Sequence, residues 1–81
     1  MNRKESVRAV RMFLHYNRTW ESRDSDAESN EAENRREYYM HKVIEDCPTD
    51  DVVMEACAGR ADDYDYVLGM LNDAADRSRK A

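Results

Sequence analysis

Two cysteines and two histidines have the most reactive side chains in this chain of 81 residues. Cys57 and His41 contain the atoms of a nucleophile and its base, but no supporting motif surrounds them. Together with Cys47 and His15 they would make four zinc ligands, yet their spacing contains no Cys-x-x-Cys or His-x-x-x-His knuckle. The sequence therefore favours reduced, partly buried thiols and surface histidines over a catalytic or metal site.

Carboxylates are abundant, but their spacing does not match a known metal-binding loop. A calcium loop that began at Asp63 would need glycine at its sixth position and glutamate at its twelfth, where the chain has Leu68 and Ala74. The chain has two glycines in all, which is too few for a loop that cradles phosphate. We therefore expect a protein that is not an enzyme and that uses no cofactor or metal.

Charge is arranged in two rows at helical spacing, one basic and one acidic. In a helix that turns by about 100° per residue, five basic side chains of the first twenty residues share one face, opposite an apolar face. We call this face the basic stripe: Lys4, Arg8, Arg11, His15 and Arg18. Four aspartates near the other end of the chain form a second row about 21 Å long. We call it the acidic row: Asp62, Asp65, Asp73 and Asp76.

The two rows give the chain a bipolar charge distribution. Residues 1–18 carry a net charge of +4 and residues 43–76 one of −9, within a total of −5. If both helices pack their apolar faces into one core, both rows point outward and do not easily neutralise each other within a monomer. Each row is then either an ordinary solvated helix face or a binding surface.

The elements that position these rows are predicted to be helices. We expect helices over residues 2–18 or 2–20, 26–46, 50–58, and 62–77 or 62–79, with the first, second and fourth forming the main bundle. Ser25 and Glu28 fit a capping box, Thr49 or Asp50 an N-cap, and Gly59 a left-handed C-terminal cap. The first two turns of the second helix look too polar to pack.

The fold class predicted is all-α, a small compact bundle of three to four amphipathic helices. Residues 1–81 are expected to form a single helical domain, with residues 21–34 as a candidate flexible acidic connector. No stretch reaches the roughly 20 apolar residues of a membrane span, and Arg8 and Arg11 interrupt any signal-peptide core. We therefore expect a cytoplasmic protein without a membrane partner. Its core is small, which favours support from self-association or a partner.

Three tyrosines are expected outside the core. Tyrosine is common both at the boundary of a core and as an anchor in protein interfaces. The candidate aromatic anchors are Tyr16, Tyr38 and Tyr66.

In size, acidity and lack of a catalytic motif, the chain resembles the small inhibitors that phages and mobile elements encode, such as anti-CRISPR and anti-restriction proteins. The resemblance implies that the acidic row covers a basic, nucleic-acid-binding surface of a protein partner, as a mimic of DNA. One alternative is a small regulator that binds nucleic acid through Lys4, Arg8, Arg11 and Arg18. Another is a homo-oligomeric assembly subunit, in the simplest case a homodimer, that associates through its apolar faces. The charged rows also allow a homotypic contact, in which the basic stripe of one copy meets the acidic row of another.

Overall fold

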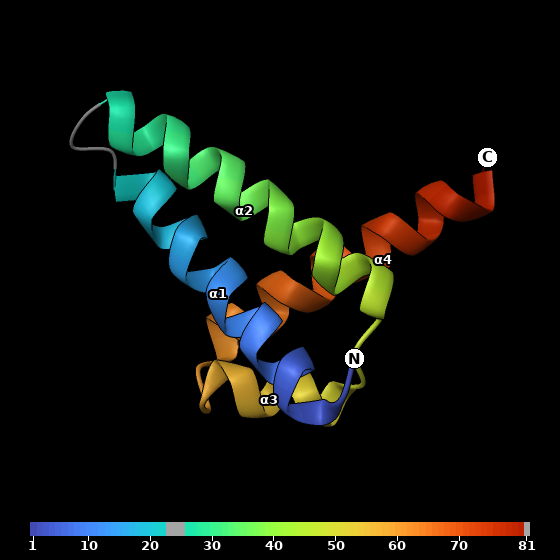
Figure 1. Ribbon diagram of the computed structural model, residues 1–81. Coiled ribbons are helices and arrows are strands. Elements are labelled where there is room, and N and C mark those ends of the chain that lie inside the picture. The colour runs from blue at the N-terminus through green and yellow to red at the C-terminus, as the bar shows by residue number, and fades with distance from the viewer. Residues whose placement is uncertain (23–25, 81) are drawn as a thin grey trace.

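The computed structural model describes residues 1–22 and 26–80, and these residues form four helices. They are α1 (Arg3–Ser22), α2 (Asp26–Asp46), α3 (Asp50–Cys57) and α4 (Ala61–Lys80) (Figure 1). The described residues contain no strand, so the predicted all-α bundle is confirmed. Within this described part, no helix has the length and apolar character needed to cross a membrane. The predicted capping box of Ser25 and Glu28 lies outside the side chains that the structure describes.

The helix ends follow local hydrogen bonding. Asn2 caps α1, because its Oδ1 accepts a hydrogen bond of 2.9 Å from the Glu5 amide and its Nδ2 donates one of 3.2 Å to Glu5 Oε1. Thr49 is the N-cap residue of α3, without a hydrogen bond from its side chain. The prediction for the end of α3 was wrong by one residue. The left-handed conformation begins at Ala58 (φ 52°) and continues through Gly59 (φ 80°).

The helices α1 and α2 pack as an antiparallel hairpin that contains most of the core. Val10 and Phe13 of α1 are fully buried, and Val43 of α2 is nearly so. The expectation that the start of α2 is too polar to pack was wrong, since Ala32 is only 2 % exposed. A side chain of this size lets the backbones of two helices approach closely. Within the candidate connector of residues 21–34, residues 21–22 and 26–34 are helical.

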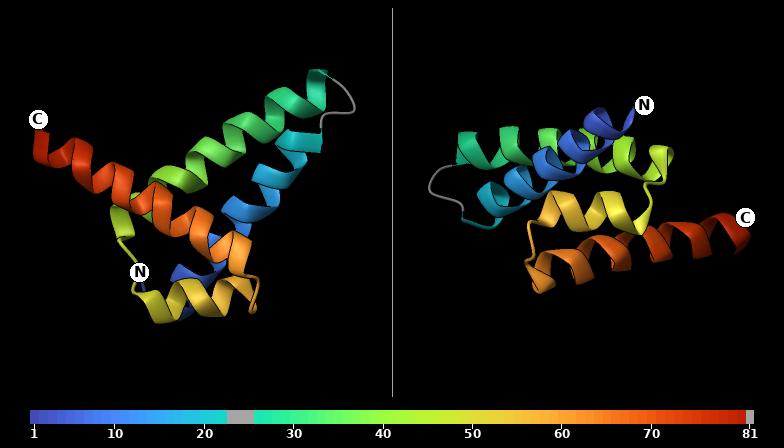
Figure 2. Two further views of the ribbon diagram at one scale, coloured as in Figure 1. Left: turned by 180° about the vertical axis from the view of Figure 1, so that it is seen from behind. Right: turned by 90° about the horizontal axis from the view of Figure 1, so that it is seen from below.

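The helix α3 lies between α1 and α4, which differs from the predicted bundle of the first, second and fourth helices (Figure 2). Four of its apolar side chains are buried, namely Val52, Val53, Ala56 and Cys57, whereas Met54 is 58 % exposed. In α4 only Val67 is buried among the hydrophobic residues, while Tyr64, Met70 and Leu71 are half-buried against the core. The C-terminal part of α4 extends past the other helices (Figure 1). One long flank of α4 is therefore left open to solvent.

Candidate partner-binding surfaces

The acidic row lies on the solvent side of α4. All four of its aspartates, Asp62, Asp65, Asp73 and Asp76, are exposed. Asp62 is in the first turn of the helix, where a carboxylate complements the positive end of the helix dipole. No ion pair joins Asp62, Asp65 or Asp73 to another described residue. Their charges are therefore available to a partner.

The acidic row borders a groove between α2 and α4, which we call the α2–α4 groove. Its volume is about 470 Å³. Asp65 and Asp73 contribute its negative charge, and Arg77 contributes one positive charge a turn beyond Asp73. The remaining lining residues are Met40, His41, Ile44, Tyr66, Gly69 and Met70. Methionine and aliphatic side chains beside carboxylates suit a ligand that has an apolar stem and a basic end.

Gly69 keeps part of this groove open. A Cβ atom built on Gly69 would have no atom of another residue within 4 Å, so the fold does not require glycine there. A glycine in the interior of a helix costs about 1 kcal/mol relative to alanine. Gly69 therefore makes α4 less stable than alanine would, and it leaves the helix backbone accessible between Asp65 and Asp73.

The basic stripe is exposed on α1, but one of its arginines is paired within the monomer. Arg18 Nη2 lies 2.8 Å from Oδ2 of Asp63, and Arg60 Nε lies 3.1 Å from the same oxygen. The aspartate involved, Asp63, is next to the acidic row and is not a member of it, so this ion pair joins the two helices without joining the two rows. Sequence spacing did not reveal that the end of α1 reaches the start of α4.

Three other residues of the basic stripe line a hollow of about 610 Å³ between α1 and α3. Lys4, Arg8 and Arg11 line this hollow and are exposed. Arg3 also lines it and is 3.7 Å from Glu55 of α3, in an exposed ion pair. Val7 and Met12 supply apolar contacts. The hollow is thus a second charged surface, of opposite sign to the α2–α4 groove.

The three candidate aromatic anchors have different environments. Tyr38 is 54 % exposed, and Lys42 Nζ lies 5.4 Å from the centre of its ring. Tyr16 is half-buried and its ring is stacked 5.9 Å from that of Tyr39. Tyr66 is 42 % exposed, although its ring stacks on Phe13 at 6.0 Å. Tyr38 is the most accessible of the three.

Tyr66 belongs to a polar cluster that the sequence analysis did not identify. Arg36 Nε donates a 2.7 Å hydrogen bond to Oδ1 of the buried Asn17, and its Nη2 donates one of 3.0 Å to the Tyr66 hydroxyl. The Tyr66 hydroxyl in turn donates to Asn17 Oδ1 at 3.3 Å. The guanidinium carbon of Arg36 also lies 5.0 Å from the Trp20 ring centre. This cluster joins α1, α2 and α4.

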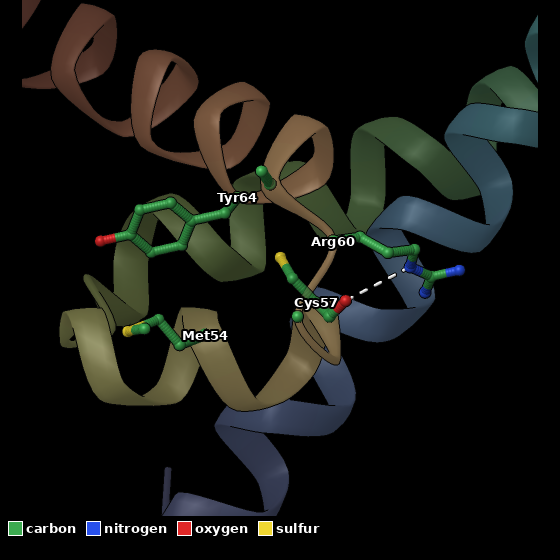
Figure 3. A pocket seen from close by; sticks show the side chains of 6 residues that line it. Met54, Cys57, Arg60 and Tyr64 are labelled. Atoms are coloured by element: carbon green, nitrogen blue, oxygen red, sulfur yellow. Dashed lines mark hydrogen bonds between the residues drawn. The ribbon is translucent and has the colours of Figure 1, made fainter.

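The two cysteines are free, and their environments differ. Cys47 is exposed and Cys57 is buried, so the expectation of partly buried thiols was wrong for Cys47. Burial, followed by the charge of Asp63, raises the pKa of the Cys57 thiol. A thiol that stays protonated is a poor nucleophile. Cys57 lines a hollow of about 340 Å³ between α3 and α4 (Figure 3), whereas His41 lines the α2–α4 groove.

The hollow around Cys57 is mostly apolar. Met54 and Tyr64 point toward it from α3 and α4, and Arg60 turns away to donate a 3.2 Å hydrogen bond from Nε to the Cys57 carbonyl (Figure 3). Among the described residues, no group of three or more histidine, cysteine or acidic side chains is placed to hold a metal ion. The hollows and the α2–α4 groove are the candidate binding surfaces of the described residues.

Comparisons with models of protein families, with curated proteins and with solved structures found no match to this chain. The function must therefore be argued from the surfaces themselves.

Proposed function

We propose that this protein is a non-enzymatic binding module that uses the acidic row to cover a basic surface of a protein partner. The observation that carries the proposal is the exposure of all four aspartates on one helix face, next to the α2–α4 groove. Electrostatic attraction between an acidic and a basic surface speeds the association of two proteins and favours one relative orientation. The groove adds apolar contacts that charge alone does not provide.

The kind of partner follows from the shape of the row. Carboxylates along about 21 Å of one helix form a line of negative charge, as phosphates do along a nucleic acid strand. A protein groove that binds nucleic acid is a matching basic surface. We therefore propose a small inhibitor or regulator of the anti-CRISPR or anti-restriction kind, which occupies such a groove and acts in the cytoplasm.

The test compares three forms of the tagged protein in pull-downs from cells of its source. The first is the wild type, the second replaces Asp62, Asp65, Asp73 and Asp76 by Asn, and the third replaces four exposed acids of α2 by Gln. These control positions are Glu31, Glu33, Glu37 and Glu45. We expect the wild type and the control to capture one protein in stoichiometric amount, and the Asn variant to lose it.

A second measurement tests whether this protein inhibits nucleic-acid binding by the captured partner. Wild type should block its binding to nucleic acid, more strongly at low salt than at high salt, and the Asn variant should not. Capture that is equal for all three forms would exclude the acidic row as the contact surface.

A second candidate function is nucleic-acid binding through α1, and the exposed Lys4, Arg8 and Arg11 around one hollow favour it. The same pull-down separates the two functions. Nucleic acid in all three eluates, without stoichiometric protein, would assign the function to the basic stripe. Replacement of these three residues by Gln should then abolish retention.

A further inference from the structure

The two charged surfaces have no lining residue in common. The helix α3 lies between α1 and α4 (Figure 2), and the hollow of the basic stripe is formed by α1 and α3, whereas the groove is formed by α2 and α4. Within one copy, Arg18 and Asp63 form the ion pair that joins these two helices. Lys4, Arg8 and Arg11 form no ion pair with any described residue. The complementary surface for each is present on a second copy of the same chain.

The dimensions of the two surfaces match. Lys4 and Arg11 are seven residues apart on α1, which is about 10 Å along the helix axis, and Asp65 and Asp73 are eight residues apart on α4, about 12 Å. Each surface is also partly apolar. Val7 and Met12 lie beside the basic side chains, and Met40, Ile44 and Met70 lie beside the acidic ones. Contact between them would bury apolar surface as well as pair charges.

Gly69 provides an independent reason to expect a close neighbour at the groove. It lies midway between Asp65 and Asp73, and no atom of another residue fills the space where its side chain would be. Glycine at a helix surface allows the backbone of a second helix to approach closely. Nothing in the described part of the monomer makes use of this opening.

We propose that the basic stripe of one copy docks on the α2–α4 groove of the next, so that the protein associates head to tail. The contact is heterologous, because it joins two different surfaces. In a head-to-tail arrangement each pair of copies engages one such contact, which leaves one basic stripe and one groove free. Assembly therefore continues beyond the dimer, into an open chain or a closed ring.

Self-association would use the surface that the proposed protein partner also needs. A rising concentration of the protein would then reduce the fraction with a free acidic row. The inference itself does not depend on that partner, because both halves of the contact belong to this chain.

The test uses two variants, each with one surface disabled by reversal of charge. R8E/R11E disables the basic stripe, and D65K/D73K disables the groove. Each variant alone should remain a monomer in sedimentation equilibrium, because one half of every contact is missing. The mixing experiment uses the neutral forms R8Q/R11Q and D65N/D73N, because reversed charges on both variants would attract each other. Their equimolar mixture should form a discrete one-to-one dimer, through the intact groove of the first variant and the intact basic stripe of the second.

Wild type in the same experiment should show a mass that rises past the dimer with concentration at about 20 mM salt. The association constant should fall at least tenfold near 500 mM salt, where screening is much stronger. Two controls change charge equally outside the proposed contact. R35E/K42E and E31K/E45K alter exposed residues of α2 that line neither surface, and both should associate like the wild type.

Several outcomes would overturn the proposal. A wild type that stays monomeric up to about 1 mM at low salt would exclude self-association, and a wild type that stops at the dimer would exclude the head-to-tail arrangement. A mixture of the two neutral variants that remains monomeric would exclude these surfaces. If circular dichroism shows that a reversal variant is unfolded, R8Q/R11Q and D65N/D73N replace it. None of these results bears on capture of a separate protein partner, so the two proposals fail independently.

Discussion

The helices α1 and α4 share one plan, a charged row opposite an apolar face, but the fold covers them to different extents. Five apolar side chains of α1 are buried, whereas only Val67 is buried in α4. The helix α1 has α2 along its length and α3 across it, while α4 packs chiefly on the short α3. Equal amphipathic patterns therefore do not imply equal burial, which depends on how many neighbours a helix has.

The two charged rows are more alike than the two apolar faces. In the basic stripe, Arg18 forms an ion pair with α4, but Lys4, Arg8 and Arg11 have none among the described residues. In the acidic row, Asp62, Asp65 and Asp73 likewise have none. Our proposal of partner binding by α4 therefore rests on its lower burial and on the α2–α4 groove, and not on a larger number of unpaired charges.

The largest expected effect is on the core of the α1–α2 hairpin. Phe13→Ala should lower the free energy of unfolding by about 3–5 kcal/mol, because the ring is fully buried and its removal leaves a cavity. A chain of this size has a total stability of roughly 4–12 kcal/mol. Urea denaturation followed by circular dichroism measures the loss.

Leu71→Ala is the matched change on α4. Leu71 is only half-buried, so its loss should cost less than half as much as Phe13→Ala. Equal losses for the two variants would mean that α4 is as firmly embedded as α1, and the comparison between the helices would fail.

Local patterns predicted most of this fold. The spacing of apolar residues gave the predicted bounds of α2, and Pro48 and the Asp50–Asp51 pair marked the break and the start of α3. The relative placement of the helices was not predicted correctly. Whether α4 packs on α2 or on α3 depends on the geometry of the turn at Ala58 and Gly59, where two successive left-handed residues reverse the chain.

The next effect concerns the polar cluster that joins α4 to the hairpin. Tyr66→Phe removes a hydroxyl that accepts from Arg36 and donates to Asn17, and should lower the free energy of unfolding by about 0.5–1.5 kcal/mol. Amide hydrogens of α4 should also exchange faster, while those of α1 change little. Hydrogen exchange read by NMR measures both.

Tyr38→Phe is the control, because no hydrogen bond of the Tyr38 hydroxyl is found among the described residues. Its effect on stability should stay within about 0.5 kcal/mol. If both tyrosine variants behave alike, the cluster does not hold α4 in place.

The sequence predicted the exposed charged surfaces better than the buried polar contacts that hold the helices together. Charged residues at helical spacing are predictable because solvent exposure is their usual state, and the acidic row is exposed throughout. Arg36 was missed, although one signal was present. It occurs at helical spacing with Ala32, Tyr39 and Val43, on the face of α2 that is otherwise apolar. A charged residue at such a position indicates a partner across the core, but the sequence does not name Asn17 and Tyr66 as that partner.

The last prediction compares two glycines, Gly69 on the open face of α4 and Gly59 in the turn before it, and the smaller effect is expected at Gly69. Gly69→Ala should raise the free energy of unfolding by about 0.5–1 kcal/mol, because alanine favours a helix and its methyl group meets no neighbour. Gly59→Ala should lower it by about 1–2 kcal/mol, because Gly59 has a φ of 80°, which costs other residues steric strain. Thermal and urea denaturation of both variants provide the comparison. A stabilised Gly69→Ala that also associates less tightly with a second copy would show that this glycine serves contacts outside the monomer. Destabilisation by Gly69→Ala would instead mean that the monomer itself needs the open space on α4.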